Sequence, residues 1–167
     1  MDLHAPRDPS SVALVSVTTT QFEAVWGMLK QAIHSVPLEQ WRTGDVEHLV
    51  PARIAYHVLE TADYYMSPDL ERFPWGGRFG VDWEKGARDA LPGQADIRDY
   101  QNEVRARVAA WLAGLGDAGL LLPDAVFRSE GMSHLDRALY VLRHTQHHTG
   151  ELCAELRRRG LPRPPWR

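Results

Sequence analysis

Cysteine and lysine are rare in this chain of 167 residues, which contains one Cys and two Lys. A single cysteine cannot form an intrachain disulfide, and it excludes a zinc site built from cysteines. The 17 Arg residues are scattered along the sequence, and the formal net charge is −3. Domains that bind nucleic acids normally carry a basic surplus, so the charge balance disfavours a nucleic acid as partner.

Long hydrophobic runs are also absent from the sequence. No stretch approaches the roughly 20 apolar residues that a membrane-spanning helix needs. The N-terminus lacks the basic segment and apolar stretch of a secretory signal. We therefore expect a cytoplasmic protein without a membrane partner. The length and the ordinary globular composition predict one domain over residues 1–167, with a core over about residues 18–160.

Apolar residues recur at helical spacing in four segments, and no segment shows convincing strand alternation. The first 15 residues are expected to form a tail or strap, and Thr18 to Thr20 offer N-caps for the first helix. Pro51 suits the first position of the second helix, and Ser133 with Asp136 resembles a capping box for the fourth. The expected helices cover about residues 20–35, 51–66 and 134–159, and a third begins at Asp96 or Gln94 and ends at about residue 115. The sequence therefore predicts an all-α four-helix bundle with long connections, which need not be a simple up-down series.

The connection over residues 67–95 is long, contains several prolines and glycines, and is rich in aromatic residues. Connections of such length are usually functional or disordered. Four aromatic side chains favour a loop that packs against the bundle and shapes a pocket. These side chains are Phe73, Trp75, Phe79 and Trp83.

His144 and His148 are the most informative pair in the sequence. Residues four apart on a helix lie on the same face, so both imidazoles can reach one metal ion. His147 is turned by about 100° from His148 and is expected to face solvent or a partner. The chain has eight histidines, so a chance pair of ordinary histidines is the alternative interpretation.

His57, in an apolar segment of the second expected helix, is the best candidate for a third metal ligand. A polar ring in such a place needs a partner, and a metal ion would be one. Glu60 and Glu151 lie three residues after His57 and His148, so either could accept a hydrogen bond from the remote N–H of a ligand. A solvated helix face is the alternative interpretation for both carboxylates.

Zinc proteases of the common helical type carry a glutamate directly after the first histidine, as general base. In this chain that position is Thr145. The sequence therefore disfavours a protease, although three histidines would still leave positions on the ion open for water or substrate.

Two segments of the sequence resemble the DinB-like superfamily, whose relatives include YfiT-like proteins, bacillithiol S-transferases and mycothiol-dependent maleylpyruvate isomerases. The segments are residues 54–61, around His57, and residues 144–152, which contain both late histidines. Glu151 stands where glutamine is frequent in the family. The resemblance spans about residues 18–160. It implies a four-helix bundle in which His57, His144 and His148 hold a divalent metal ion.

The resemblance also implies transfer of a low-molecular-weight thiol to an electrophile, or a thiol-assisted isomerisation. We expect zinc or nickel as the metal, a small-molecule thiol and an electrophile as substrates, and a homodimer. Arg143 or Arg53 could bind an acidic thiol, although each could equally be a surface residue. Cys153 is expected in the packed core, away from the metal. A metal-dependent hydrolase and a non-catalytic metal- or ligand-binding stress-response module are the alternatives.

Overall fold

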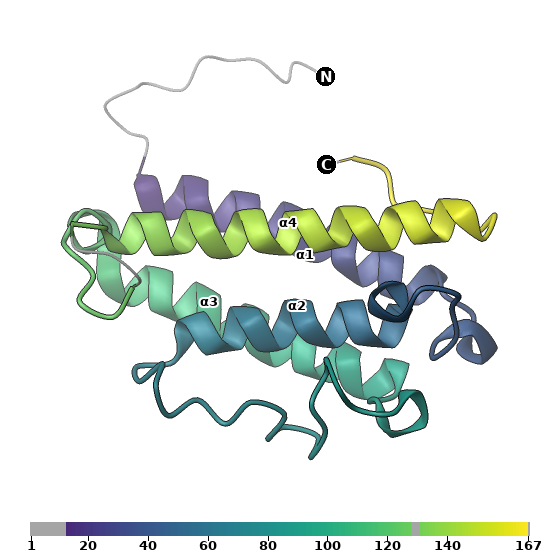
Figure 1. The fold of residues 1–167 in the computed structure, drawn as a ribbon. Coiled ribbons are helices and arrows are strands. Elements are labelled where there is room, and N and C mark those ends of the chain that lie inside the picture. The colour runs from purple at the N-terminus through teal and green to yellow at the C-terminus, as the bar shows by residue number, and fades with distance from the viewer. Residues whose placement is uncertain (1–12, 128–130, 167) are drawn as a thin grey trace, which may run out of the picture.

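Four long α-helices form the computed structural model, which describes residues 13–127 and 131–166 (Figure 1). No β-strand is formed by the residues in these two ranges, so the predicted all-α four-helix bundle is confirmed. Three short 3-10 turns, η2, η3 and η4, lie in the connections at Leu38–Gln40, Glu47–Leu49 and Arg88–Ala90. The long helices are α1 (Leu14–Ser35), α2 (Pro51–Met66), α3 (Gln94–Leu120) and α4 (His134–Arg158).

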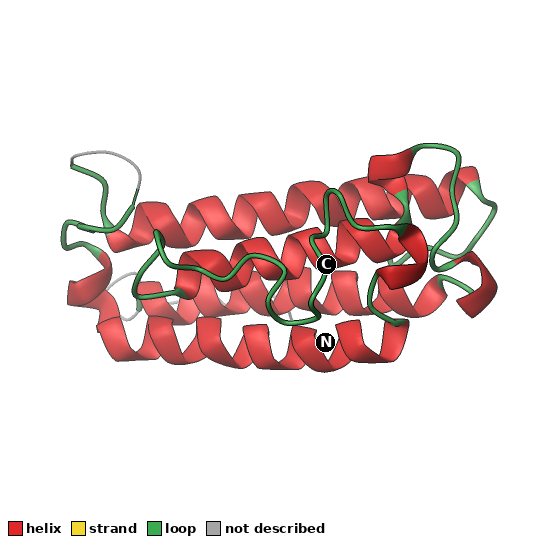
Figure 2. Cartoon of the chain, turned by 60° about the horizontal axis from the view of Figure 1, so that its bottom comes forward, coloured by secondary structure: helices red, strands yellow, loops and turns green. Residues whose placement is uncertain are grey.

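The helices pack in an order that differs from their order in the sequence. Both α1 and α2 pack mainly against α3 and α4, whereas α1 and α2 lie diagonally opposite each other. Figure 1 shows α1 with α4 in its upper layer and α2 with α3 in its lower layer. The longest connection joins α2 and α3, which are neighbours but run in the same direction, so the chain has to return along the bundle between them. Figure 2 shows the loop between α2 and α3 running along the outside of the bundle.

The first helix begins earlier than the sequence pattern indicates, at Leu14 instead of about residue 20. Thr18 is buried inside this helix and does not cap it. Leu14 and Val15 pack against the core, and the Val15 N–H donates to Asp117 Oδ1 at 2.9 Å. Packing of an apolar face therefore outweighs the modest helix propensity of the threonines. The expected tail up to residue 15 is wrong for residues 14 and 15, while residues 1–12 lie outside the described part.

The other helix boundaries agree more closely with the expected ones. The second helix covers the predicted residues, and the fourth begins at His134 behind the predicted capping box of Ser133 and Asp136. The third helix was expected to end near Leu115, and the backbone does leave helical geometry at Gly116, where φ is 63°. One further helical segment then reaches Leu120, whose side chain is fully buried. Burial of that leucine explains why the chain continues past the glycine.

Leucines from all four helices meet in the core. Leu29, Leu59, Leu112 and Leu152 are each completely buried. Cys153, beside Leu152, is only half-buried and packs against the edge of this core. The expectation of a fully packed cysteine is therefore only partly right, because its helix turns it toward the rim.

A buried ion pair holds the connection between α3 and α4. The guanidinium of Arg137 donates to both carboxylate oxygens of Asp124, each at 2.6 Å. It also donates to the backbone carbonyl of Tyr65 at 2.9 Å, which joins this connection to the end of α2. Two parallel hydrogen bonds between an arginine and a carboxylate fix orientation as well as distance. The pair therefore sets the position from which α4 begins.

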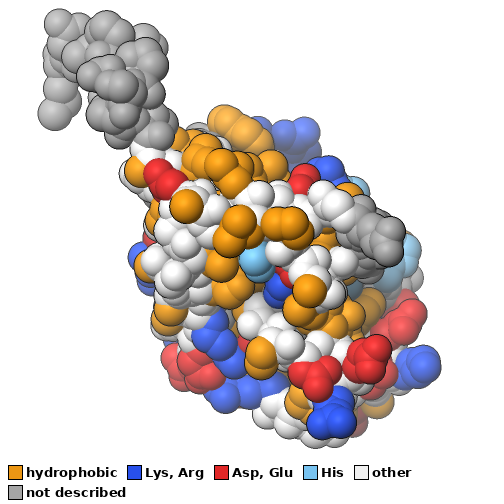
Figure 3. Space-filling view, turned by 90° about the vertical axis from the view of Figure 1, so that its left-hand side faces the viewer, with side chains coloured by type: hydrophobic (Ala, Val, Ile, Leu, Met, Phe, Trp, Pro, Cys, Tyr) orange, Lys and Arg blue, Asp and Glu red, His pale blue; other side chains and the backbone are white. Residues whose placement is uncertain are grey.

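The surface of the bundle carries charged side chains of both signs beside exposed hydrophobic ones. Figure 3 shows one end of the molecule, where acidic and basic side chains lie interspersed among hydrophobic ones. Within the described ranges, no helix has the combination of length and apolar character that crossing a membrane would require.

Candidate metal centre

Three histidines from two helices converge between α2 and α4. The Nε2 atom of His57 lies 3.2 Å from Nε2 of His144 and 3.2 Å from Nε2 of His148. The donor nitrogens of all three rings lie within 4.8 Å of one another. His144 and His148 are neighbours because they are one turn apart on α4, and His57 reaches them because α2 packs along α4. The structure thus brings together all three residues that the sequence singled out as candidate ligands.

The spacing of these nitrogens suits a divalent metal ion. Metal–nitrogen bonds of about 2.0–2.1 Å place two ligand nitrogens roughly 2.8–3.4 Å apart, with the shorter separations in octahedral and the longer in tetrahedral geometry. The two measured separations of 3.2 Å fall inside this range. A single N–H on Nε2 of His57 cannot satisfy both neighbours, whereas one ion can accept a lone pair from each ring. The three-histidine group can therefore hold a divalent metal ion.

The surroundings of His57 keep its ring neutral. Burial lowers the pKa of His57 to about 4, the nearby ring of His148 lowers it as well, and the carboxylate of Glu151 opposes the change. A neutral imidazole is the form that binds a metal ion, because protonation removes the lone pair. His57 is therefore in its metal-binding form at neutral pH.

Hydrogen bonds on the far side of two rings orient their nitrogens. The Nδ1 atom of His148 lies 2.6 Å from Oε2 of Glu151, the contact that the sequence suggested. When Nδ1 carries the proton and donates it to the carboxylate, Nε2 presents its lone pair to the centre. The hydroxyl of Thr61 lies 3.3 Å from Nδ1 of His57 and can serve the second ring in the same way.

Glu60 does not accept a hydrogen bond from His57, the role that the sequence suggested for it. Its Oε1 atom accepts hydrogen bonds from the backbone N–H of Gly76 at 2.6 Å and from the hydroxyl of Tyr56 at 3.1 Å. Thr61 occupies the place beside His57 because it is one full turn further along α2. That i,i+4 spacing is visible in the sequence, so the contact of Thr61 could have been predicted.

His147 points away from the centre, as its position on the helix predicted. Its side chain is 66% exposed, and its Nε2 atom lies 3.5 Å from Oε1 of Glu151. His147, His148 and Glu151 form a second group of donors within 4.8 Å. This group uses the carboxylate that already orients His148, so it competes with the three-histidine group and does not complete it.

Trp83, in the loop between α2 and α3, covers one side of the centre. Its ring centroid lies 4.0 Å from that of His57. The expectation that aromatic residues of this loop pack against the bundle is therefore fulfilled at the site itself. Elsewhere in the loop, Phe79 packs against Tyr56 of α2, with 5.2 Å between the ring centroids.

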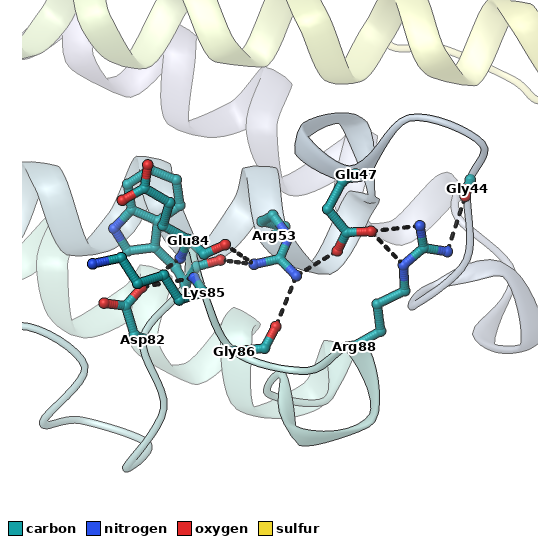
Figure 4. Close-up of polar contacts among 9 residues, drawn as sticks. Gly44, Glu47, Arg53, Asp82, Glu84, Lys85, Gly86 and Arg88 are labelled. Carbon is teal, nitrogen blue, oxygen red and sulfur yellow. Dashed lines mark hydrogen bonds and ion pairs between the residues drawn. The ribbon is translucent and has the colours of Figure 1, made fainter.

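Arg53 fixes the position of Trp83. Its guanidinium donates to the backbone carbonyls of Trp83, Glu84 and Gly86, the latter two at 2.8 and 2.9 Å (Figure 4). It also forms an ion pair with Glu47 at 2.6 Å. With 3% exposure, Arg53 is a buried anchor for the loop. These contacts give no support to the suggestion that it binds an acidic thiol, because both terminal nitrogens donate within the protein and the remaining Nε is buried without a partner.

The remaining candidates from the sequence lie outside the three-histidine group. Arg143 is exposed, and its guanidinium lies 5.7 Å from the ring centroid of Tyr140. Cys153 is absent from both donor groups, and burial raises the pKa of its thiol. This thiol is therefore not an activated nucleophile.

Comparison with known families agrees with this geometry. The model of the DinB superfamily matches residues 21–152 of the chain. The matched segment contains His57, His144 and His148 and most of the bundle. No curated protein matches the sequence.

Proposed function

We propose that this chain, which belongs to the DinB superfamily, is a metal-dependent enzyme that transfers a low-molecular-weight thiol to an electrophile. The observation that carries the proposal is the convergence of three imidazole nitrogens, with separations of 3.2 Å from His57 to each of the other two. The family assignment supports a metal-dependent function. The thiol specificity is our inference from the kind of site.

His57, His144 and His148 would hold the ion, which we propose to be zinc or nickel. Imidazole ligands suit both metals. Three neutral ligands leave the full positive charge on the ion and leave positions open for other ligands. When bound, such an ion supplies Lewis acidity that lowers the pKa of a thiol or a water molecule toward neutrality.

Other side chains of the protein orient and shield this centre. Glu151 holds the proton on Nδ1 of His148, and Thr61 does the same for His57. Trp83 covers one face of His57 and so limits the approach of water from that side. These contacts keep the ligand nitrogens directed at one point.

The thiol has to come from a small molecule. Cys153 is the only cysteine of the chain, and it does not belong to the donor group. Burial keeps its thiol protonated by raising its pKa. A thiolate is the reactive form in such transfers, so the nucleophile must be a thiol that is activated at the metal centre.

The proposal is tested with metal-loaded protein, a panel of thiols and the chromogenic electrophile 1-chloro-2,4-dinitrobenzene. The panel contains cysteine, glutathione, bacillithiol and mycothiol. In the reaction, the sulfur forms a bond to the ring carbon, the carbon–chlorine bond breaks, chloride leaves and the thiol proton passes to solvent. We expect thiol-dependent turnover above background that is lost in His57→Ala, His144→Ala and His148→Ala. The exposed His34, changed to Ala, is the matched control and should retain the activity.

Two outcomes would contradict the proposal. Equal turnover of ester or amide substrates with and without thiol would identify the centre as one that activates water, and the protein as a hydrolase. Full metal occupancy without turnover of this electrophile or of maleylpyruvate, for any thiol, would leave a metal-binding module without catalysis.

A further inference from the structure

A cavity lies between α2, α3 and the loop that follows α2. It has a volume of about 400 Å³, and none of the three histidines lines it. The volume is within the range of pockets that hold small organic ligands. Its lining contains both charged and apolar side chains, so its chemistry can be derived from their contacts.

Glu60 is the most unusual residue in the lining of this cavity. It is 1% exposed, and its Oε1 atom receives two hydrogen bonds, from Gly76 and Tyr56. Its Oε2 atom is also buried but has no hydrogen-bond partner. A buried polar atom without a partner costs free energy, so such an atom in a residue that lines a cavity points to a missing partner.

The charges around the cavity leave Glu60 without a counter-ion. Arg107 pairs with Asp63 at 3.1 Å and with Glu103 at 3.8 Å, and Arg78 also pairs with Glu103. Both arginines of the lining are therefore engaged by the other two carboxylates. Three carboxylates against two guanidinium groups give the lining a formal charge of −1 when Glu60 is ionised. One positive charge from a ligand would balance it.

The remaining wall of the cavity is mainly apolar, with Ser67 and Tyr100 as its other polar members. Met66 at the end of α2 and Phe73 and Pro74 in the loop line it together with Pro68. An aromatic and aliphatic wall next to a buried carboxylate favours a ligand that combines a cationic head with a small hydrophobic body. A metal ion is disfavoured by such a wall, because hard cations prefer several oxygen ligands.

We propose that this cavity binds a small organic monocation, with its amidinium, guanidinium or ammonium head on Oε2 of Glu60 and its apolar part against Phe73 and Met66. The proposal does not rest on the function proposed for the histidines, because the two sites share no lining residue. Burial raises the pKa of the Glu60 carboxyl, as expected for a group that lacks its partner. A bound cation would remove that penalty.

Benzamidine is a suitable probe, since its protonated amidinium has no lone pair to offer a metal at the histidine centre. Benzamide has nearly the same shape without the charge. We would titrate each compound into the full-length protein and follow the amide signal of Gly76 by NMR, because this N–H donates to Glu60. Benzamidine is expected to shift the Gly76 signal in a saturable manner, and benzamide is expected to bind at least about tenfold more weakly.

Glu60→Gln keeps the shape and the hydrogen-bond acceptor for Gly76 but removes the charge. It should weaken benzamidine binding by about tenfold or more. The exposed Glu39, changed to Gln, is the matched control and should leave the affinity unchanged. Phe73→Ala tests the apolar wall and should weaken benzamidine more than methylguanidinium, which lacks a ring.

Three results would overturn the proposal. They are the absence of a saturable shift at about 10 mM benzamidine, equal affinity for benzamide, and equal affinity of wild type and Glu60→Gln. If Glu60→Gln does not fold, the comparison of Phe73→Ala with wild type for the two cations still decides whether the cavity is the binding site. None of these measurements involves the three histidines. Their outcome is therefore independent of whether that group binds a metal or transfers thiols.

Discussion

Nδ1 of His148 and Oε2 of Glu151 lie 2.6 Å apart on adjacent turns of α4. The carboxylate can hold the proton of this ring on Nδ1 and leave Nε2 free to face His57 and His144. The partly exposed pair stands at the edge of the centre, with 20% of the His148 side chain and 34% of the Glu151 side chain accessible. An outer hydrogen bond of this kind usually contributes to metal affinity without touching the ion.

Glu151→Gln is therefore expected to weaken metal binding by about tenfold, since a neutral amide accepts the Nδ1 proton less strongly than a carboxylate. The affinity for zinc and nickel would be measured by competition with a chromophoric chelator. Glu39→Gln, at an exposed site outside both donor groups, serves as the control. Unchanged affinity in Glu151→Gln would show that the carboxylate does not support the centre.

His147 and His148 form a matched pair of neighbours for testing which donor group binds the metal. His148→Ala should abolish stoichiometric binding, because it removes a central ligand. His147→Ala should retain one ion per chain, because this ring is largely exposed and outside the three-histidine group. Elemental analysis of the purified variants gives the answer. Loss of metal in both variants would instead favour the group of His147, His148 and Glu151.

Arg53→Met is expected to destabilise the fold by about 3 kcal/mol, because it leaves partly buried carbonyls of the loop without donors and removes one of the two arginine partners of Glu47. The free energy of unfolding would be measured by urea denaturation. Arg42→Met, at an exposed position, should change stability by less than about 0.5 kcal/mol. Because Arg53 also holds the backbone of Trp83, the variant should increase the solvent exposure of that indole. A stability equal to wild type would mean that the loop does not depend on this anchor.

Glu60→Gln should change the pH dependence of stability. The pKa of Glu60 is raised in the folded protein above its usual 4.5, mainly by burial. The unfolded chain therefore releases its proton first, and the free energy of unfolding of the wild type falls as pH rises from about 4.5 through the raised pKa. The variant lacks this loss, so its stability relative to wild type should be higher at pH 7 than at pH 4.

Thermal unfolding of both proteins at the two pH values measures this difference, and Glu39→Gln, at an exposed position, is the matched control. A relative stability of Glu60→Gln that falls between pH 4 and pH 7 would contradict the raised pKa.

Much of the metal centre could be predicted from helical spacing alone. His144 and His148 could be placed side by side because residues four apart share a helix face, whatever the rest of the chain does. Glu151 could be placed behind His148 for the same reason. His57 is 87 residues before His144, so spacing alone could not join them. Its apolar context and the resemblance to the DinB-like superfamily made it the third candidate.

The loop over the centre could be foreseen only in part. Its aromatic content indicated that it packs against the bundle, but its sequence does not say which ring meets which helix. Trp83 reaches His57 because Arg53, from inside α2, holds three carbonyls of the loop. The contact between Trp83 and His57 therefore requires that Arg53 first binds a backbone segment about 30 residues later in the chain.

The sequence established the local features: four helices, their approximate ends, the face that His144 and His148 share, and the absence of a second thiol. These follow from the chain's own periodicity, caps and composition, which act over a few residues. Tertiary packing decided the rest: which helices are neighbours, how His57 meets the late histidines, and why the second oxygen of Glu60 is buried beside a cavity without a partner. Such features depend on contacts between distant segments, and their geometry exists only once the core has formed.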